Sequence, residues 1–389
     1  MSDSDTSKTS PPRLYLSPPH MAAGSRERLV QAFDSNWVAP VGPDLDAFEA
    51  EFAAYLGVKH AVALASCTAA LHLALRFAGV TDGQPVFVSD LTFVAPANAI
   101  RYVGGQPVFI DSERSTWNMD AELLRAAVQR AIERNQQPKA VIAVDIFGQS
   151  ADMQPIRQVC EEFGMFLIED AAEALGATYH GQPAGTLGDI GCFSFNGNKM
   201  LTTSSGGMLV TNDAQCAAKV RHWATQARDP AVHYEHSELG HNYRMSNLLA
   251  AVGRGQLEVL NEHVSTRRKI HRAYREALED LKGIEFIPNK RDESSCWLTC
   301  VLIDEAVLGV SREEIRLELE QQNIESRPCW KPMHLQPCFA DAPMIGGAVA
   351  EQIFQQGLCL PSGSGMNDHD VSRVVSIIRA MVSGVAINV

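Results

Sequence analysis

The chain has 389 residues, of which 46% are hydrophobic and 20% are charged, and its formal net charge is −13. This length predicts two domains, or one large domain with an appendage, and the composition is ordinary for a globular protein. The acidic balance argues against nucleic acid as a partner, because nonspecific binding of nucleic acid needs a basic surface, although a local pocket can still be positive.

The chain begins with a polar segment, MSDSDTSKTSPP, which lacks the apolar core of a signal peptide and predicts a flexible tail at residues 1–13. No apolar run approaches the length of a membrane span. The nine cysteines are widely spread and form no CxxC pair, which argues against a zinc site or a disulfide framework and favours reduced thiols. We therefore expect a soluble cytoplasmic protein with no metal and no membrane partner.

Apolar runs of strand length alternate with helix-like stretches over the first half of the chain. The predicted strands are AVALA (61–65), PVFVSD (85–90), QPVFID (106–111), AVIAVD (140–145) and MFLIED (165–170), and the predicted helices cover 69–78, 121–135 and 153–163. Continuous apolar strands separated by amphipathic helices predict an α/β fold in which helices flank a mostly parallel sheet. Several strands end in Asp or Ser, at the edge where such sheets usually bind ligands.

The pattern changes after about residue 191. The short runs CFSF and GGMLVT predict strands that could add antiparallel pairs, and residues 248–281 predict a long helix that leads into a second domain. From about residue 283, mixed strands and helices predict a smaller α/β domain. We place the large domain at 14–255 and the small C-terminal domain at 256–389.

Two charged residues stand next to buried-looking segments. Asp170 closes an apolar strand, and Lys199 lies in FSFNGNKMLTTSSGGMLVT, between strand-like flanks. Asp170 alone could equally be the cap of a following helix, and lysine is normally a solvated charge. A buried lysine, however, needs a partner or a lowered pKa. Pyridoxal phosphate (PLP) requires such a pair, a lysine for its aldehyde and a carboxylate for its ring nitrogen, so the pair predicts a PLP site.

Three further features fit the same cofactor. In SCTAALHLAL a strand gives way to a helix, and a helix N-terminus with nearby hydroxyls can bind phosphate, although an ordinary capped helix explains this segment more simply. Ser194 could add a hydroxyl, and Phe93 could stack its ring on a planar cofactor. Taken alone, Ser194 is more simply a strand residue and Phe93 a core residue.

Together these motifs resemble those of the DegT-type nucleotide-sugar aminotransferases, which are PLP enzymes of fold type I. The resemblance covers almost the whole chain, and the order and spacing of the segments also match. The matching segments are SPPHM, NWVAPVGPDLDAFE, SCTAALHLAL, DLTFVAPANAI, EDAAEALGATY, GDIGCFSFNGNKMLTTSSGGMLV, GHNYRMSNLLAAVG, ESRPCWKPMHLQP and CLPSGSGM. Within the family, the combination of EDAAEALG, NGNK and WKPMH resembles the UDP-sugar 4-aminotransferases of the bacillosamine pathway.

The resemblance implies a role for each residue around the cofactor. Lys199 would form the Schiff base and move a proton between cofactor and sugar, and Asp170 would pair with the ring nitrogen. The remaining implied contacts are the phosphate-binding turn at Cys67 and Thr68, the stacked ring of Phe93, the phosphate-binding hydroxyl of Ser194, and Asn242, which would reach the phosphate from the neighbouring subunit. The turn is usually Gly-Thr or Ala-Thr in the family. The role of Asn242 implies a homodimer with a shared active site.

Two positions depart from the commonest family residues. Glu173 replaces His or Gln and Asn196 replaces His, and both would lie near the O3′ atom of the cofactor and the sugar. The bacillosamine subgroup shares both changes, so they favour that substrate, although an exposed helix residue is the simpler interpretation of Glu173.

Two short segments match regions that contact the nucleotide sugar in this subgroup. The matching residues are Asn36, Trp37, Val38 and Ala39 in the first segment and Lys331, Pro332, Met333 and His334 in the second. Lys331 and His334 could bind a diphosphate by charge-assisted hydrogen bonds. The simpler interpretations are a surface lysine and a packed histidine.

The implied reaction transfers the amino group of glutamate, through pyridoxamine phosphate (PMP), to the C4 keto group of a UDP-linked 4-keto-6-deoxy-N-acetyl-hexose. The product is a UDP-4-amino-4,6-dideoxy sugar for glycan biosynthesis, and ping-pong kinetics are expected. A PLP-dependent nucleotide-sugar dehydratase and a dTDP-linked keto-sugar aminotransferase are the alternatives. Lys199 and Asp170 argue against a non-catalytic regulator, and Lys199 argues against the dehydratases in which histidine replaces it.

Overall fold

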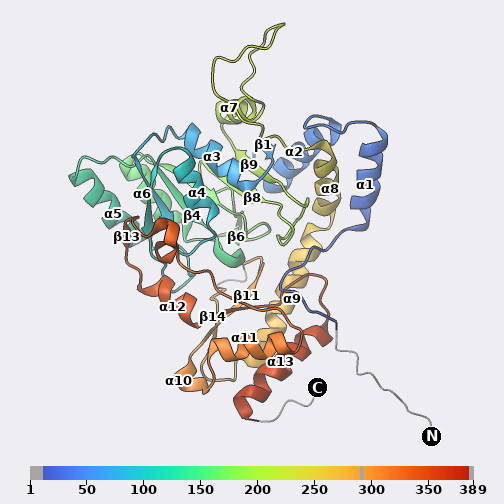
Figure 1. Cartoon of the computed structure of the whole chain (residues 1–389), viewed down its shortest axis with the longest axis vertical. Coiled ribbons are helices and arrows are strands. Elements are labelled where there is room, and N and C mark those ends of the chain that lie inside the picture. The colour runs from blue at the N-terminus through green and yellow to red at the C-terminus, as the bar shows by residue number, and fades with distance from the viewer. Residues whose placement is uncertain (1–11, 290–292, 385–389) are drawn as a thin grey trace.

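The computed structural model describes residues 12–289 and 293–384 and shows a large α/β body joined to a smaller one (Figure 1). The large body contains an eight-stranded sheet in the order β1-β9-β8-β5-β4-β2-β3-β13. Its strands are β1 (His60–Leu64), β2 (Pro85–Ser89), β3 (Gln106–Ile110), β4 (Ala140–Val144), β5 (Phe166–Asp170), β8 (Ile190–Ser194), β9 (Gly207–Thr211) and β13 (Met344–Ile345).

Most neighbouring strands of this sheet are parallel, as predicted from the apolar runs. Only β9 runs against its neighbours, pairing antiparallel with β1 and with β8. The expected antiparallel pairing of the CFSF and GGMLVT strands is therefore confirmed. The tight β8–β9 pair matters for function, because the loop between these two strands carries Lys199.

Both faces of the sheet are buried under helices. Along β2, Val86 and Val88 belong to one apolar cluster and Phe87 to the cluster on the opposite face. This alternation follows from the two-residue period of a strand, and burial on both sides explains why the strand appears in the sequence as an apolar run. The helices of the large body are α1 (Ala23–Asp34), α2 (Pro43–Leu56), α3 (Cys67–Phe77), α4 (Ala95–Tyr102), α5 (Ala121–Glu133), α6 (Met153–Phe163), α7 (Ala214–Ala224) and α8 (Asn247–Glu258).

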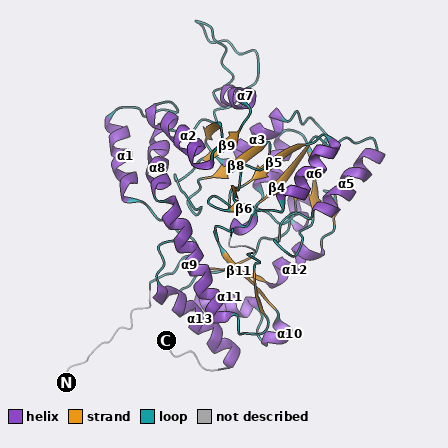
Figure 2. Cartoon of the chain, turned by 180° about the vertical axis from the view of Figure 1, so that it is seen from behind, coloured by secondary structure: helices purple, strands orange, loops and turns teal. Residues whose placement is uncertain are grey.

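The long helix predicted at 248–281 is in fact two helices. α8 ends at Glu258, and α9 (Leu260–Leu278) begins after Val259, whose φ of −106° and ψ of 6° lie outside the helical region. The two helices pack on different partners. α8 lies so close to α1 that a Cβ on Gly255 would be 2.6 Å from the Ser25 backbone, whereas α9 crosses into the small body (Figure 2).

The small body is an antiparallel sheet covered by helices. Its strand order is β10-β11-β14-β12, and helices α11 and α13 pack with α9 against it. The elements are β10 (Ile284–Phe286), β11 (Thr299–Ile303), α10 (Glu305–Leu308), α11 (Arg312–Gln321), β12 (Arg327–Pro328), α12 (Ala348–Gln356), β14 (Gly357–Leu360) and α13 (Asp368–Ser383). Among the described residues, no helix is long and apolar enough to cross a membrane.

The chain crosses between the two bodies at places other than α9. Leu14 forms a parallel bridge to Ile324, so the start of the predicted large domain lies against the small body. Conversely, β13 pairs with β3 and extends the edge of the large sheet. Segments on both sides of the predicted boundary at residue 255 therefore tie the two bodies together, which positions small-body residues beside the carboxyl edge of the large sheet.

Candidate active site

A cavity of about 240 Å³ opens at the carboxyl edge of the large sheet, between the loop after β8 and the start of α3. Eight of the nine predicted cofactor-binding residues line it together, although they come from four separate segments. These residues are Cys67, Thr68, Phe93, Asp170, Glu173, Ser194, Asn196 and Lys199. Ligands of α/β sheets bind at such strand ends, so the position agrees with the predicted function of the edge.

The N-terminus of α3 forms one end of this cavity. Ser66 caps the helix by accepting a hydrogen bond from the backbone N–H of Ala69 at 3.1 Å. The N–H groups of Cys67 and Thr68 precede the first intrahelical bonds, so they are available to a ligand. A Cβ on Gly207 would lie 2.4 Å from the Cys67 nitrogen, so only glycine lets β9 approach this turn. The segment is thus both a capped helix and an anion site.

Asp170, the last residue of β5, lies beside this helix start. Its Oδ1 accepts the backbone N–H of Ala172 at 3.1 Å and contacts the Cys67 thiol at 3.8 Å. Burial raises its pKa to about 6, while the Ala172 hydrogen bond and the charge of Lys199 act in the other direction. No helix follows Asp170, since residues 171–177 form turns. The helix-cap alternative for this aspartate is therefore wrong.

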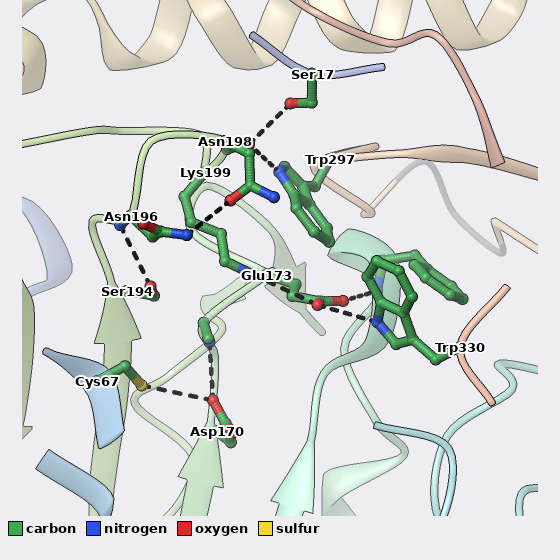
Figure 3. Close-up of polar contacts among 12 residues, drawn as sticks. Ser17, Cys67, Asp170, Glu173, Ser194, Asn196, Asn198, Lys199, Trp297 and Trp330 are labelled. Atoms are coloured by element: carbon green, nitrogen blue, oxygen red, sulfur yellow. Dashed lines mark hydrogen bonds and ion pairs between the residues drawn. The ribbon is translucent and has the colours of Figure 1, made fainter. Parts of the chain in front are cut away.

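Lys199 is held by its two neighbours at the centre of the cavity (Figure 3). Its Nζ lies 3.4 Å from Oε1 of Glu173 and 4.0 Å from the centre of the Trp297 ring, and its side chain is 12% exposed. A carboxylate and an aromatic face both stabilise an ammonium group. The apolar strands around the loop hold its backbone, so this lysine is a positioned group and not a solvated surface charge.

Glu173 is buried, which excludes the exposed-helix interpretation of this residue. Its Oε2 accepts the backbone N–H of Phe147 at 2.8 Å, and its Oε1 accepts the indole N–H of Trp330 at 3.3 Å as well as contacting Lys199. With three donors around one carboxylate, Glu173 is fixed in position beside the lysine.

Two tryptophans that no sequence motif singled out close the cavity from the small body. Trp297 donates its indole N–H to the carbonyl oxygen of Asn198 at 2.7 Å, and Ser17 donates to the same oxygen at 2.8 Å. Trp330 precedes the predicted KPMH segment by one residue, so that motif could have pointed to it. No local signal singled out Trp297, because its role depends on a contact with a loop about a hundred residues away.

The remaining cavity residues differ in exposure. Asn196 donates its backbone N–H to Ser194 Oγ at 3.4 Å and its side-chain amide to Asn198 at 3.4 Å, which orders the loop before Lys199. Phe93 is 60% exposed, so one face of its ring is open. A planar ligand in the cavity could cover that face.

The predicted nucleotide-sugar segments and Asn242 do not line this cavity in the single chain. Residues 36–39 lie between α1 and α2, where Trp37 and Val38 are exposed. Asn242 forms a β-bridge with Thr225 at the base of the loop that projects beyond α7 (Figure 1). Within the single chain, Asn242 is thus not among the residues that line the cavity.

The second predicted segment is anchored to the end of β2. His334 contacts Asp90 through Nδ1 at 2.7 Å and Glu351 through Nε2 at 3.3 Å, and the His334 backbone N–H donates to Asp90 at 3.0 Å. Met333 is buried, and its N–H donates to the Asp90 carbonyl at 2.9 Å. In this arrangement His334 serves as a packed, carboxylate-bound histidine, the simpler of the two interpretations.

The donors of the cavity fit pyridoxal phosphate. A helix N-terminus with adjacent hydroxyls suits the phosphate, a buried carboxylate suits the ring nitrogen, and a positioned amine suits the aldehyde. An exposed aromatic ring suits the face of the pyridine. Lys199 and Asp170 lie in the same cavity as the start of α3, so one cofactor could reach all three features.

Comparison with known proteins gives a consistent picture. A sequence model of the DegT/DnrJ/EryC1/StrS aminotransferase family matches residues 19–379. EpsN of Bacillus subtilis, named as a pyridoxal phosphate-dependent aminotransferase, is 49% identical over 371 residues, covering 94% of this chain and 95% of EpsN. GDP-perosamine synthase of Caulobacter vibrioides is 38% identical, covering 94% of this chain and 98% of that enzyme. DesI, crystallised in the presence of its TDP-sugar product, has a TM-score of 0.87 and 32% identity, covering 96% of this chain and 93% of DesI.

Proposed function

Because this chain belongs to the DegT/DnrJ/EryC1/StrS aminotransferase family and is a PLP-dependent sugar aminotransferase, we propose a specific reaction for it. It transfers the amino group of glutamate to the C4 keto group of a UDP-linked 4-keto-6-deoxy-N-acetyl-hexose. The product is a UDP-4-amino-4,6-dideoxy sugar, a building block for glycan biosynthesis. The arrangement of Lys199, Glu173 and Asp170 in one cavity is the observation that carries the proposal.

PLP, when bound, withdraws electrons from the substrate carbon that loses a proton. The chain's own residues would hold the cofactor and manage the proton. The N–H groups at the start of α3 and the hydroxyls of Thr68 and Ser194 would bind the phosphate, and Phe93 would cover one face of the ring. Asp170 would hold the proton on the ring nitrogen, for which it must be ionised. A pKa of about 6 leaves it largely ionised at neutral pH.

Lys199 is the residue we propose for proton transfer between the cofactor and the sugar. Its Nζ lies 3.4 Å from Glu173, which keeps the amine directed into the cavity. The two tryptophans that contact this pair exclude water from one side, and exclusion of water strengthens the electrostatic interactions in the cavity. General acid–base catalysis of this kind typically contributes a factor of 10² to 10⁴ in rate.

Glutamate as donor and a homodimer with a shared site complete the proposal. The loop beyond α7 projects from the body and carries exposed apolar side chains, including Val232, Tyr234 and Leu239. Such side chains favour contact with another protein surface. A second copy would bring its Asn242 to the phosphate end of the cavity, beside the exposed face of Phe93.

The identity of the nucleotide separates the main proposal from its closest alternative. Similarity to DesI favours a TDP-linked keto sugar, whereas the combined EDAAEALG, NGNK and WKPMH motifs favour UDP. A PLP-dependent dehydratase is the alternative in another reaction class. Incubation with glutamate and UDP-, dTDP- or GDP-linked 4-keto sugars, followed by mass spectrometry, distinguishes these cases. A product that has lost a hydroxyl without gaining an amine would overturn transamination.

Substitution of the lysine tests the site directly. Lys199→Ala should bind PLP without the covalent bond, so the cofactor absorbance should differ from that of the parent and amine transfer should fall by at least a factor of 10³. Lys269→Ala is the matched control, because Lys269 is an exposed lysine paired with Asp368 on α13. An unchanged cofactor spectrum in Lys199→Ala would contradict the assignment of this lysine.

A further inference from the structure

Three cysteine thiols meet in the core of the small body. Cys300 in β11 and Cys359 in β14 are direct partners across the antiparallel pair, with their Sγ atoms 3.5 Å apart. Cys329 follows β12, and its Sγ lies 3.9 Å from that of Cys359. All three Sγ atoms lie within 4.8 Å of one another, and each residue is at most 1% exposed. The wide sequence spacing of these cysteines had predicted no metal site.

The separations of the three sulfur atoms suit a shared ion. A thiolate–zinc bond is about 2.3 Å long, and three sulfur atoms at that distance from one ion would lie roughly 4 Å apart. Among the described residues, the thiols have only long hydrogen-bond contacts with groups outside the cluster: Cys300 with the Leu298 carbonyl and Cys359 with the Pro328 carbonyl, both at 3.9 Å. An ion that replaced their protons would therefore disrupt no strong hydrogen bond.

A basic side chain, Arg312, lies close enough to Cys329 to act on it electrostatically. Arg312 begins α11, and its buried Nε and Nη1 atoms have no hydrogen-bond partner among the described residues. A guanidinium group without these hydrogen bonds is a nearby positive charge, and a set of thiolates would neutralise it.

The ligand type selects the ion. This group of mutually close ligand atoms contains three cysteines and, within the described part of the chain, no histidine or carboxylate. Structural zinc sites have four ligands, whereas thiolates also select Cu(I). We propose that Cys300, Cys329 and Cys359 form a three-thiolate site for a soft monovalent ion of the Cu(I) class. Binding releases the remaining thiol protons to solvent and requires no oxidant or reductant.

The site is connected to the catalytic cavity through the chain itself. Cys329 directly precedes Trp330, whose indole N–H donates to Glu173 beside Lys199 (Figure 3). A Cβ on Gly357 would lie 2.6 Å from Cys329 Sγ, so the thiol packs directly on the β14 backbone and has little room to move independently. The backbone at Cys329 therefore links the thiol cluster directly to the tryptophan beside Glu173.

Competition with a chromogenic chelator tests the binding. Full-length, PLP-loaded protein carrying Cys338→Ser, which removes the exposed thiol, is titrated anaerobically with Cu(I) against bathocuproine disulfonate. We expect one Cu(I) per chain and an X-ray absorption spectrum with three sulfur neighbours. Cys329→Ala should weaken binding by at least a factor of 100. Cys216→Ala, a buried cysteine of the large body, should bind as the parent does.

Two results would overturn the proposal. The first is a parent protein that does not compete with the chelator. The second is a Cys329→Ala variant, folded by circular dichroism, that binds as tightly as the parent. If Cys329→Ala does not fold, Cys300→Ala and Cys359→Ala provide the same comparison. Tighter binding of Zn²⁺ than of Cu(I) would contradict the assigned ion class. The titration uses no sugar substrate, so its outcome is independent of the proposed reaction.

Discussion

At the scale of single residues, Asp170 and Glu173 are both acidic and lie three positions apart, but their surroundings differ. Asp170 ends a buried strand and bonds to one backbone N–H, whereas Glu173 lies in a turn and binds three donors. The contact with Lys199 supports the proposed positioning role of Glu173, and the single backbone bond of Asp170 is compatible with its proposed role toward the ring nitrogen. The sequence placed both near the cofactor, but only the contacts distinguish their functions.

Asp170→Asn should separate folding from cofactor chemistry. Burial raises the pKa of Asp170 to about 6. Ionisation of this carboxylate therefore destabilises the cofactor-free fold above pH 6, whereas it has no effect on stability below the unfolded pKa of about 4. Asparagine retains an oxygen acceptor for the Ala172 N–H. The cofactor-free variant should therefore be more stable than the parent at pH 7.5, by roughly 3 kcal/mol at most, and the difference should close toward pH 4.

Chemical denaturation at several pH values measures this difference. The same variant loaded with PLP should lose amine transfer almost completely, because a neutral amide cannot hold the ring nitrogen in its protonated form. A stability difference that stays constant between pH 4 and 7.5 would contradict the pKa argument, even if activity is lost.

At the scale of elements, the contact between α3 and β9 shapes the phosphate end of the cavity. Gly207→Ala would place a Cβ 2.4 Å from the Cys67 nitrogen and 2.7 Å from the Phe193 carbonyl, both of which are backbone atoms that cannot simply rotate away. The helix start must shift, so PLP affinity should fall by at least tenfold. Gly365→Ala is the control, since its Cβ would meet only ordinary contacts at 3.9 Å. Equilibrium dialysis of PLP gives the affinity, and equal affinities for the two variants would contradict the prediction.

The 3₁₀ turn η3 (Met333–Leu335) is fastened to the end of β2 by a buried contact between His334 and Asp90. His334→Ala would leave Oδ2 of Asp90, whose side chain is 0% exposed, without its side-chain partner, and an unsatisfied buried polar group costs about 1–3 kcal/mol. Glu351→Ala removes the other, 42% exposed carboxylate and should cost less than about 1 kcal/mol. Urea denaturation measures both. The double variant Asp90→Asn with His334→Ala should recover part of the stability that His334→Ala loses. If it recovers none, the broken contact between His334 and Asp90 is not the cause of the lost stability.

At the scale of the whole molecule, the single chain holds a cavity with one open side. Phe93 is exposed at its rim, and the loop carrying Asn242 projects away from it. If two copies exchange Asn242, neither Lys199→Ala nor Asn242→Ala homodimers should be fully active. A mixed dimer should restore one complete site, because one copy supplies the intact lysine and the other the intact asparagine.

This complementation is measured by refolding the two variants together and assaying amine transfer against each variant alone. Activity well above the sum of the separate variants supports a shared site. A mixture that is no more active than that sum, although size-exclusion chromatography shows dimers, would mean that Asn242 acts within its own chain or not at all.

The sequence by itself determined the local elements and the centre of the site. Continuous apolar runs of strand length revealed the strands buried on both faces, and the amphipathic stretches between them revealed the helices. Asp170 and Lys199 were visible since both are charged residues next to apolar strands. The long helix around Val259 was predicted as one piece, because neighbouring helical patterns do not show that their packing partners differ.

Only the tertiary structure decided which distant segments complete the site. Trp297 and Trp330 reach the cavity because α9 and the crossing segments hold the small body against the sheet edge, and nothing in the neighbourhood of Trp297 indicates that contact. The thiols of Cys300, Cys329 and Cys359 meet for the same reason: strand pairing brings together positions that lie up to 59 residues apart. The local sequence pattern determines which way a side chain points and whether it is exposed. The packing of the elements determines which distant residues come close together.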